Sequence, residues 1–335
     1  MNTIGFDTDR YIAAQLKDMR TLLRSPSDRL YIEVGGKLIQ DRHSARVLPG
    51  YREDARFEIL KALNRISDVV LVVSAKDVLR GRIRGDFNIS YDKETLRTID
   101  ELRKRGLPIN HVAISLLSKG DEDLKEIKAF ERLLKKTGVV SYHFFASKNY
   151  EHAESLLEDL EQNPFVSVFR KLVFVVSPGG GSGKFGICLS QLYHEMKRGH
   201  TPRYVTFGGF PMYDLPRSHP LNLAYMAALA DFGDSLREDP LSPGSILPER
   251  ELINFNLLRQ LSKAFGKEGK YLRAIRSATD MCVSVLSKGI VNEETVAREA
   301  AAEIARRLMR YKFEVAKGKE DEATLLRVKE ILMML

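Results

Sequence analysis

The segment 171–191, KLVFVVSPGGGSGKFGICLSQ, constrains the fold of this chain more than any other. An apolar run at 172–176 is typical of a buried strand, and the pattern after Lys184 is typical of a helix. Between them, glycines allow backbone N–H groups to turn towards one point, where the helix N-terminus and Lys184 add positive charge. The segment therefore predicts a phosphate- or nucleotide-binding loop made of Pro178, Gly179, Gly180, Gly181, Ser182, Gly183 and Lys184.

This loop departs at two positions from the usual phosphate-binding pattern, G-x-x-x-x-G-K-[ST]. Pro178 occupies the first glycine position, and Phe185 occupies the position of the hydroxyl that would hold Mg²⁺. Ser182 or Ser190 could supply that hydroxyl instead. The alternative interpretation is a tight glycine turn in a strand-to-helix corner, and Phe185 favours a divergent site or one that only binds.

The composition narrows the class of protein. The chain has 335 residues, of which 44% are hydrophobic and 29% charged, which predicts a soluble globular protein long enough for two domains. No apolar run approaches the roughly 20 residues needed to cross a bilayer, and the start lacks the pattern of a signal peptide. Cys188 and Cys282 have neither metal-ligand spacing nor a disulfide framework. We therefore expect a cytoplasmic protein without a membrane partner.

The net charge of +8 favours an anionic ligand. The basic residues are spread along the chain and mostly interleaved with acidic ones, and no basic tail or RNA-binding aromatic signature is present. A phosphorylated small molecule or nucleotide is therefore a better candidate partner than a nucleic acid.

Strand-like and helix-like segments alternate through the first two thirds of the chain, which predicts a doubly wound, mostly parallel α/β sheet. The expected strands are 30–34, 69–73, 111–117, 139–145, 172–176 and 203–207. The stretch 239–248, with three prolines, is expected to be a connection, and everything after Arg250 to be helical. The predicted division is an N-terminal α/β domain (1–165), a P-loop-like α/β segment (166–248) and a helical region (249–335).

Ligands of such sheets bind beyond the carboxyl ends of the strands, where several candidate residues lie. Asp77 and Asp214 follow expected strands and are candidate catalytic carboxylates, and Asp214 and Asp231 are candidate ligands of Mg²⁺ bound with ATP or GTP. His219 is a candidate acid or base. The alternatives are ordinary turn or helix-end aspartates, and a histidine that bonds its own turn.

Four basic residues follow the first expected strand and could hold a second, anionic substrate. They are Lys37, Arg42, His43 and Arg46. The alternative for this group is a solvated basic loop.

Several motifs in a fixed order resemble a known family. They are YIEVGGKL, RHSARVLPGY, DVVLVVSAKDV, IRGDFNISYD, PGGGSGK, CLSQLYHEMKRG, FPMYDLPRSHPLNLAYMAALAD and SATDMCV. Together they resemble the uncharacterised prokaryotic family called domain of unknown function 1846, over about Ile4 to Tyr311. The family has no established reaction. The resemblance implies that 178–184 and 214–231 belong to a shared site, and that this chain is a short form lacking a C-terminal domain.

The resemblance also implies two departures from the family pattern. Gly208 and Gly209 form an insertion, and Met226 stands where an acidic residue is expected. The leading hypothesis is a divergent phosphotransferase or NTP hydrolase. The alternatives are a non-catalytic nucleotide or phosphometabolite sensor, and a structural subunit whose apolar ILMML end is buried in a partner or a second copy. An NAD-type enzyme is disfavoured because the G-x-G-x-x-G spacing is absent.

Overall fold

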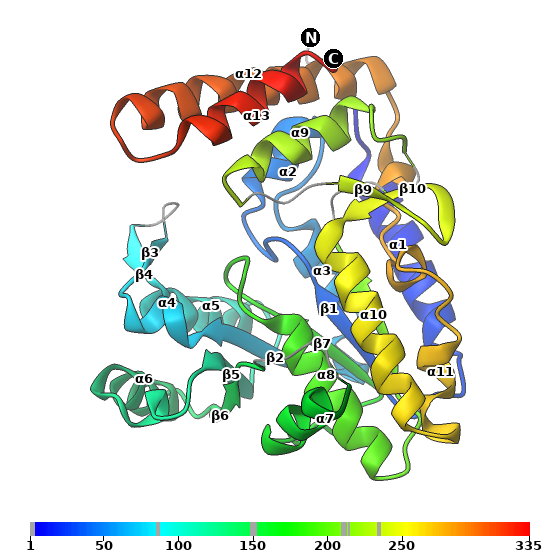
Figure 1. The fold of residues 1–335 in the computed structure, drawn as a ribbon. Coiled ribbons are helices and arrows are strands. Elements are labelled where there is room, and N and C mark those ends of the chain that lie inside the picture. The colour runs from blue at the N-terminus through cyan, green and yellow to red at the C-terminus, as the bar shows by residue number, and fades with distance from the viewer. Residues whose placement is uncertain (1–3, 85–87, 148–152, 209–212, 214, 233–235) are drawn as a thin grey trace.

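A six-stranded parallel sheet lies at the centre of the part of the chain that the structure describes. The computed structural model describes residues 4–84, 88–147, 153–208, 213, 215–232 and 236–335 (Figure 1). The strands are β1 (Leu30–Val34), β2 (Ser67–Ser74), β5 (His111–Leu117), β6 (Val140–Phe145), β7 (Leu172–Val176) and β8 (Arg203–Phe207). Their order is β6-β5-β2-β7-β1-β8, with every neighbouring pair parallel. The predicted α/β class is confirmed.

Both faces of the sheet are covered, as the uninterrupted apolar character of its strands requires. In β2, Val69, Leu71 and Val73 belong to one buried cluster, whereas Val70 and Val72 belong to a second cluster on the opposite face. Successive side chains of a strand point to opposite faces, so a run of apolar residues fits a strand buried on both sides.

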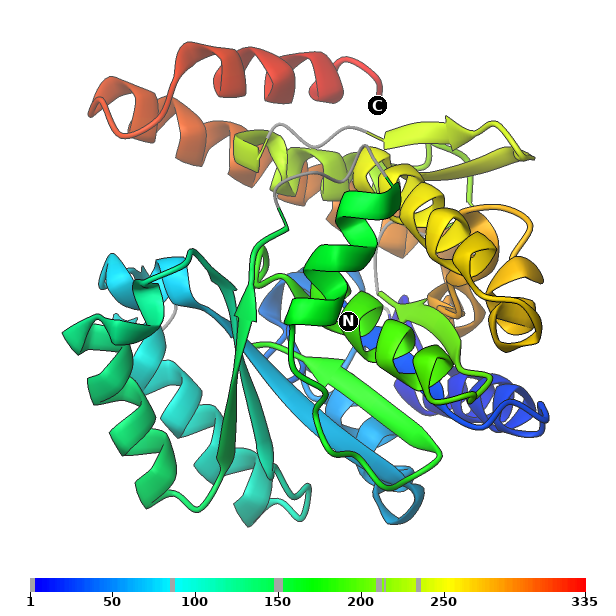
Figure 2. The ribbon, with the colours of Figure 1, turned by 60° about the horizontal axis from the view of Figure 1, so that its bottom comes forward.

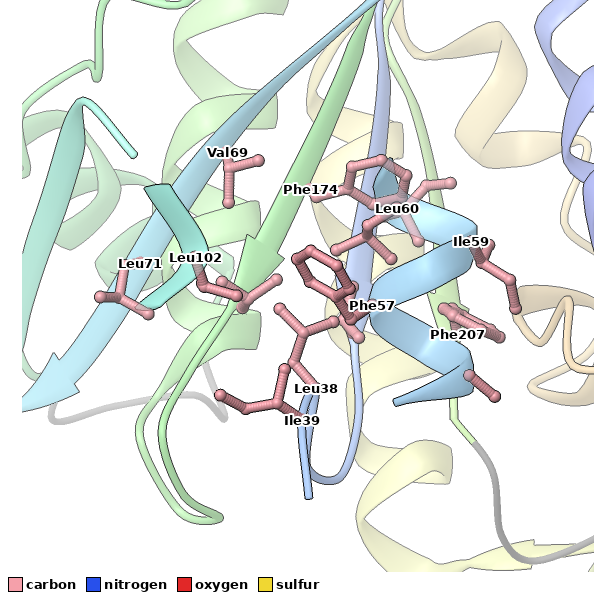
Figure 3. Close-up of a cluster of buried hydrophobic side chains, with 14 of the residues drawn as sticks. Leu38, Ile39, Phe57, Ile59, Leu60, Val69, Leu71, Leu102, Phe174 and Phe207 are labelled. Atoms are coloured by element: carbon pink, nitrogen blue, oxygen red, sulfur yellow. The ribbon is translucent and has the colours of Figure 1, made fainter. Parts of the chain in front are cut away.

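The buried cluster on the first face includes side chains of helices from two separate parts of the chain. They are α1 (Thr8–Leu23), α2 (Arg42–Val47), α3 (Ala55–Ala62), α4 (Ala75–Leu79), α5 (Tyr91–Lys104), α6 (Lys125–Lys136), α9 (Pro220–Ala228), α12 (Glu293–Ala316) and α13 (Glu322–Leu332). Of these, α9, α12 and α13 lie farther from the sheet and pack on one another (Figure 2). Figure 3 shows part of this core, in which Phe57 of α3 appears between Leu38 and Phe174 of β7.

The second face is covered by α7 (Ala153–Gln162), α8 (Lys184–Lys197), α10 (Glu249–Ala264) and α11 (Lys270–Arg273). The chain leaves β7 through α8 on this face, whereas it leaves the adjacent β2 through α4 and α5 on the first face. The connections therefore diverge between β2 and β7, which makes a crevice at their carboxyl ends the expected ligand position in this type of sheet.

The expectation of a connection at 239–248 is wrong, because this stretch forms most of a hairpin. β9 (Leu236–Asp239) pairs antiparallel with β10 (Ser242–Pro248). A register irregularity between Ser242 and Ile246 accommodates Pro243, whose missing N–H a regular ladder would not tolerate. A second small hairpin pairs β3 (Ile83–Arg84) with β4 (Ile89–Ser90).

The expectation of continuous helix after Arg250 is also wrong between α10 and α12. Apart from α11, the region contains only the 3₁₀ turns η4 (Lys267–Gly269), η5 (Thr279–Met281) and η6 (Leu286–Gly289). Part of this backbone also bonds to the sheet: the Val283 N–H donates to the Thr206 carbonyl oxygen of β8 at 2.9 Å, and Cys282 forms a parallel bridge with Thr206. The remaining 3₁₀ turns are η1 (Asn64–Ile66), η2 (Asp121–Asp123) and η3 (Ala230–Phe232).

The C-terminal helices α12 and α13 lie side by side against α9 (Figures 1 and 2). Apolar residues at four- and seven-residue steps bury one side of α12, since Val296, Ala300, Ile304 and Tyr311 are buried. In the ILMML end Ile331 is buried, whereas Met333 is 80% exposed. No helix in the described ranges is long and apolar enough to cross a membrane.

Strands from both sides of residue 165 belong to the same sheet. β7 and β8, from the second predicted unit, pair with β1 and β2 from the first. The predicted boundary therefore falls between two strands of one sheet, and the division into three units stays a prediction.

Candidate functional site

The glycine loop, residues 177–184, joins the carboxyl end of β7 to the start of α8. As expected, α8 begins at Lys184. Gly183 is its N-cap residue and has φ 76°, a left-handed conformation that side chains other than glycine adopt only with strain. Gly180 and Gly181 are exposed, whereas Ser177, Pro178, Ser182 and Lys184 are buried. The tip of the loop therefore faces solvent while its polar side chains face inward.

Strand β5, which β2 separates from β7 in the sheet, contacts the loop. The Ser115 hydroxyl donates to the Ser182 carbonyl oxygen at 2.5 Å and lies 3.1 Å from the Val73 carbonyl oxygen. A Cβ atom on Gly183 would lie 3.1 Å from the Leu116 side chain and 3.3 Å from the Ser115 hydroxyl. The loop conformation is thus set by both backbone geometry and close packing.

Replacement of Gly183 by alanine is expected to lower the free energy of unfolding by about 1–2 kcal/mol, because it adds left-handed strain to a crowded position. Chemical denaturation would measure this loss. Gly180→Ala is the matched control, since a Cβ there meets nothing within 4 Å. Equal losses for the two variants would contradict a loop held in this conformation.

Lys184 carries a buried positive charge at the start of α8. The residue is 8% exposed, and its ammonium donates to the Ser177 hydroxyl at 3.2 Å. That hydroxyl in turn donates to the Gly179 carbonyl oxygen at 2.6 Å. Within the described ranges, no carboxylate oxygen lies within 4.0 Å of the ammonium. A cation at a helix N-terminus is electrostatically unfavourable unless an anion lies beside it.

Two further features at the same place leave donors available. Ser182 is 4% exposed, and its hydroxyl has no hydrogen-bond partner among the described residues. The first turn of α8 contains no acidic residue, and its N-cap residue Gly183 has no side chain that could cap the first N–H groups of the helix. Hydroxyl, ammonium and helix N–H groups together can bind an oxyanion.

Asp77, beyond β2, is buried and already paired. Its carboxylate lies 3.1 Å from a guanidinium nitrogen of Arg82. The Arg82 guanidinium lies 5.8 Å from the centre of the Tyr91 ring, and the Tyr91 hydroxyl lies 2.5 Å from where a Cβ on Gly179 would be. Asp77 is thus linked to the glycine loop through two side chains, and its catalytic role stays a prediction.

Asp231 lies in η3 and is exposed. Burial, and next the charge of Asp231, raise the pKa of Tyr311 to about 12. Asp231 also contributes, after Asp77, to a raised pKa of Arg82. Two of the predicted carboxylates therefore act on one arginine. No group of three or more metal-binding side chains is found within the described ranges, and Asp214 lies outside them.

His219 is the N-cap residue of α9. Its Nδ1 accepts from the Leu221 N–H at 3.2 Å, and its Nε2 pairs with Glu293. Both ring nitrogens therefore have partners that belong to α9 and α12, which matches the alternative of a histidine that bonds its own turn. A role as acid or base stays a prediction.

The four predicted basic residues have different surroundings. Lys37 lies in the turn after β1, and Arg42 is exposed at the start of α2. Arg46 and His43 lie 3.1 and 3.4 Å from the carboxylate of Glu303 on α12. Arg46 and His43 therefore contact α12.

Glu303 is the centre of a basic cluster that was not foreseen. Besides Arg46 and His43, it pairs with Arg306 at 2.9 Å and Arg307 at 3.0 Å. The carboxylate is 2% exposed, and these partners hold its pKa far below its usual range despite burial. One negative charge among three guanidinium groups leaves an excess of positive charge, where α2 meets α12.

Other residues near the loop were also missed from sequence. Arg82, Tyr91 and Ser115 hold Asp77 and the loop in place. Tyr91 lies in the motif IRGDFNISYD, which resembles the family, and this motif could have indicated Tyr91 as a site residue. Ser115 sits inside an apolar strand, where a lone serine gave no comparable indication.

The fold and the loop define an α/β protein with a parallel sheet covered on both faces and a glycine loop where connections diverge. The chain belongs to the family described as "Domain of unknown function DUF1846, N-terminal", whose model matches residues 4–335. Similar curated proteins are named "UPF0371 protein". Those from Clostridium tetani and Clostridium botulinum strain Alaska E43 are 37% and 38% identical over 98% of this chain. The chain spans 66% of the length of these relatives.

Proposed function

We propose that the glycine loop binds the phosphate groups of a nucleotide or another phosphorylated small molecule. The buried ammonium of Lys184 carries this proposal, because no described carboxylate neutralises it and its charge opposes the dipole of α8. A phosphate group beside Lys184 would remove both unfavourable interactions. The Ser182 hydroxyl, which has no partner in the part of the chain that the structure describes, would donate to the same group.

The position of the loop supports the same ligand class. It lies next to the divergence between β2 and β7, the place where open α/β sheets bind ligands. In this proposal Lys184 contacts the β- and γ-phosphates, and ATP or GTP with Mg²⁺ is the candidate cofactor. Lys37 and Arg42 would contact the anionic group of an acceptor, and the setting is cytoplasmic.

Catalysis requires more than phosphate binding. Transfer or hydrolysis would break the bond from the γ-phosphorus to its bridging oxygen and would need a base for the proton of the acceptor. Asp77 is paired with Arg82 and His219 with Glu293. These pairings favour the second candidate function, a nucleotide or phosphometabolite sensor that does not turn its ligand over.

Lys184→Ala is expected to abolish ligand-induced stabilisation. For the unaltered protein, a nucleotide at 100 times its Kd should add about 2.7 kcal/mol to the free energy of unfolding. Thermal unfolding with ATP, GTP and their diphosphates, each with Mg²⁺, would measure this. Lys136→Ala, on the exposed end of α6, is the control and should keep the full shift. The proposal is wrong if none of these ligands stabilises the unaltered protein.

Phosphate release measured in the same samples separates the two candidate functions. Release above background that is lost in Lys184→Ala supports a phosphotransferase or hydrolase. A thermal shift that depends on Lys184, with release at background, supports a sensor. A shift that is equal in Lys184→Ala and the unaltered protein favours a purely structural loop.

A further inference from the structure

A cavity lies at the opposite edge of the sheet from the glycine loop, where β8 begins. It has a volume of about 530 Å³ and is lined by Ser25, Arg203, Tyr271, Ile275 and Arg276, among others. Arg203 is the first residue of β8, and Tyr271 belongs to α11. The volume falls in the range typical of small-molecule sites. The cavity is therefore a separate place from the carboxyl edge, where the glycine loop lies.

The Arg203 side chain is the reason to expect a ligand there. It is half-buried, and within the described ranges its guanidinium makes no hydrogen bond and has no carboxylate within 4.0 Å. Burial lowers the pKa of Arg203, whereas a nearby carboxylate would raise it. A desolvated charge with unused donors is costly unless an anion binds to it.

A second guanidinium lines the same cavity. Arg276 is exposed and likewise has no described carboxylate within 4.0 Å of its guanidinium. Asp280 is the acidic residue of the lining, and its carboxylate accepts from the backbone N–H groups of Arg276 and Ser277 at 2.9 and 3.3 Å. The Lys270 ammonium, 4.9 Å from the Tyr271 ring centre, adds another positive charge beside the wall.

The wall of the cavity is fixed by contacts independent of any ligand. The Arg203 N–H donates to the Arg29 carbonyl oxygen at 2.8 Å, which anchors the start of β8. Arg273 donates to the carbonyl oxygens of Ser262 and Phe265, each at 2.7 Å, which ties α11 to the end of α10. The backbone segments that carry Arg203 and Arg276 are therefore anchored before any ligand binds. This lowers the entropic cost of binding.

We propose that this cavity is a binding site for a small oxyanion, held by the guanidinium groups of Arg203 and Arg276 with Tyr271 forming the apolar wall. The shared chemistry is that of phosphate and carboxylate groups, both of which match the planar fork of an arginine. The site is separate from the glycine loop, so it would hold a second molecule or a regulatory anion.

Isothermal titration calorimetry with pyrophosphate and with citrate, at ionic strength matched by NaCl, tests the proposal. All measurements use protein that carries Lys184→Ala, because this substitution removes the proposed loop site. At least one of the two anions is expected to bind this variant. Adding Arg203→Gln should weaken that binding by about tenfold or more, because charge-assisted hydrogen bonds are lost. Which anion binds distinguishes a phosphate ligand from a carboxylate ligand.

Two further variants complete the experiment. Arg276→Gln, at an exposed position, should weaken binding without affecting the fold. Arg132→Gln, on the exposed surface of α6, should leave binding unchanged. Arg203→Gln should also not lower the melting temperature without ligand, since it removes a charge that has no counterion among the described residues. Absence of binding by both anions, or equal affinities for the Arg203 and Arg132 variants, would overturn the proposal.

Discussion

Replacement of Arg56 by methionine is expected to lower the free energy of unfolding by about 3–5 kcal/mol, because it leaves a buried carboxylate without its cation. Arg56 is 3% exposed, and one of its guanidinium nitrogens lies 3.2 Å from the Asp41 carboxylate. The same nitrogen donates to the carbonyl oxygens of Gly35 and Lys37, at 3.2 and 3.1 Å. Chemical denaturation followed by circular dichroism would measure the loss.

The control for this prediction is an exposed pair in the same region. Arg52 lies 2.9 Å from Glu58 and 2.8 Å from Asp9, and all three side chains are exposed, so Arg52→Met should cost about 1 kcal/mol or less. A double-mutant cycle with Asp41→Asn would isolate the coupling of the buried pair. If Arg56→Met costs no more free energy of unfolding than Arg52→Met, the Arg56–Asp41 pair does not stabilise the turn at 35–37.

The buried pair also has a consequence for the candidate substrate-binding residues. Gly36 has φ 70°, and a Cβ on it would lie 2.2 Å from the Arg56 guanidinium. The turn therefore closes tightly over this arginine, and Lys37 follows directly. Loss of Arg56 should disorder the position of Lys37 as well as lower stability.

The second large effect is expected at Glu303. Glu303→Gln should lower the free energy of unfolding by about 2–3 kcal/mol, because three arginines then lose their shared carboxylate. The partial exposure of those arginines keeps the value below that for a fully buried pair. Glu299→Gln is the control, since its partner Arg298 is 64% exposed and the expected loss is about 0.5 kcal/mol.

Acid unfolding provides an independent readout for Glu303. Its pKa in the folded protein is depressed, so its stabilising contribution is present above the pKa of an unfolded glutamate, 4.5, and is lost as pH falls below that value. The stability of the unaltered protein should therefore fall more steeply with acidification than that of Glu303→Gln. Parallel acid profiles would contradict the depressed pKa.

The strands were predictable because each combines an apolar run with turn signals at both ends. In β2 the run is buried on both faces, and its predicted limits differ from the observed ones by two residues or fewer. The hairpin at 236–248 was not predictable, because three prolines are typical of a connection and the irregular pairing that accommodates Pro243 leaves no sequence pattern. The extended region around Cys282 depends on a bond to Thr206, a contact between distant segments.

In the candidate site, too, features set by adjacent residues were predictable, whereas contacts between distant segments were not. The start of α8 at Lys184 follows from local backbone chemistry, and this prediction is confirmed. The pairing of Arg46 with Glu303 joins positions 257 residues apart in the chain, and the link from Asp77 to Gly179 requires Arg82 and Tyr91 in three dimensions. Local patterns therefore located the loop but not the partners around it.

The insertion of β7 between β1 and β2 has a consequence for the order in which the chain folds. Strands β2, β5 and β6 are neighbours both in sequence and in the sheet, so they can pair as soon as they are synthesised. β1 has no neighbour in the sheet until β7 is made, about 140 residues later, which imposes a large loop-closure cost. The amino-terminal strand and its turn, with Lys37, should therefore become ordered last during synthesis, together with β8.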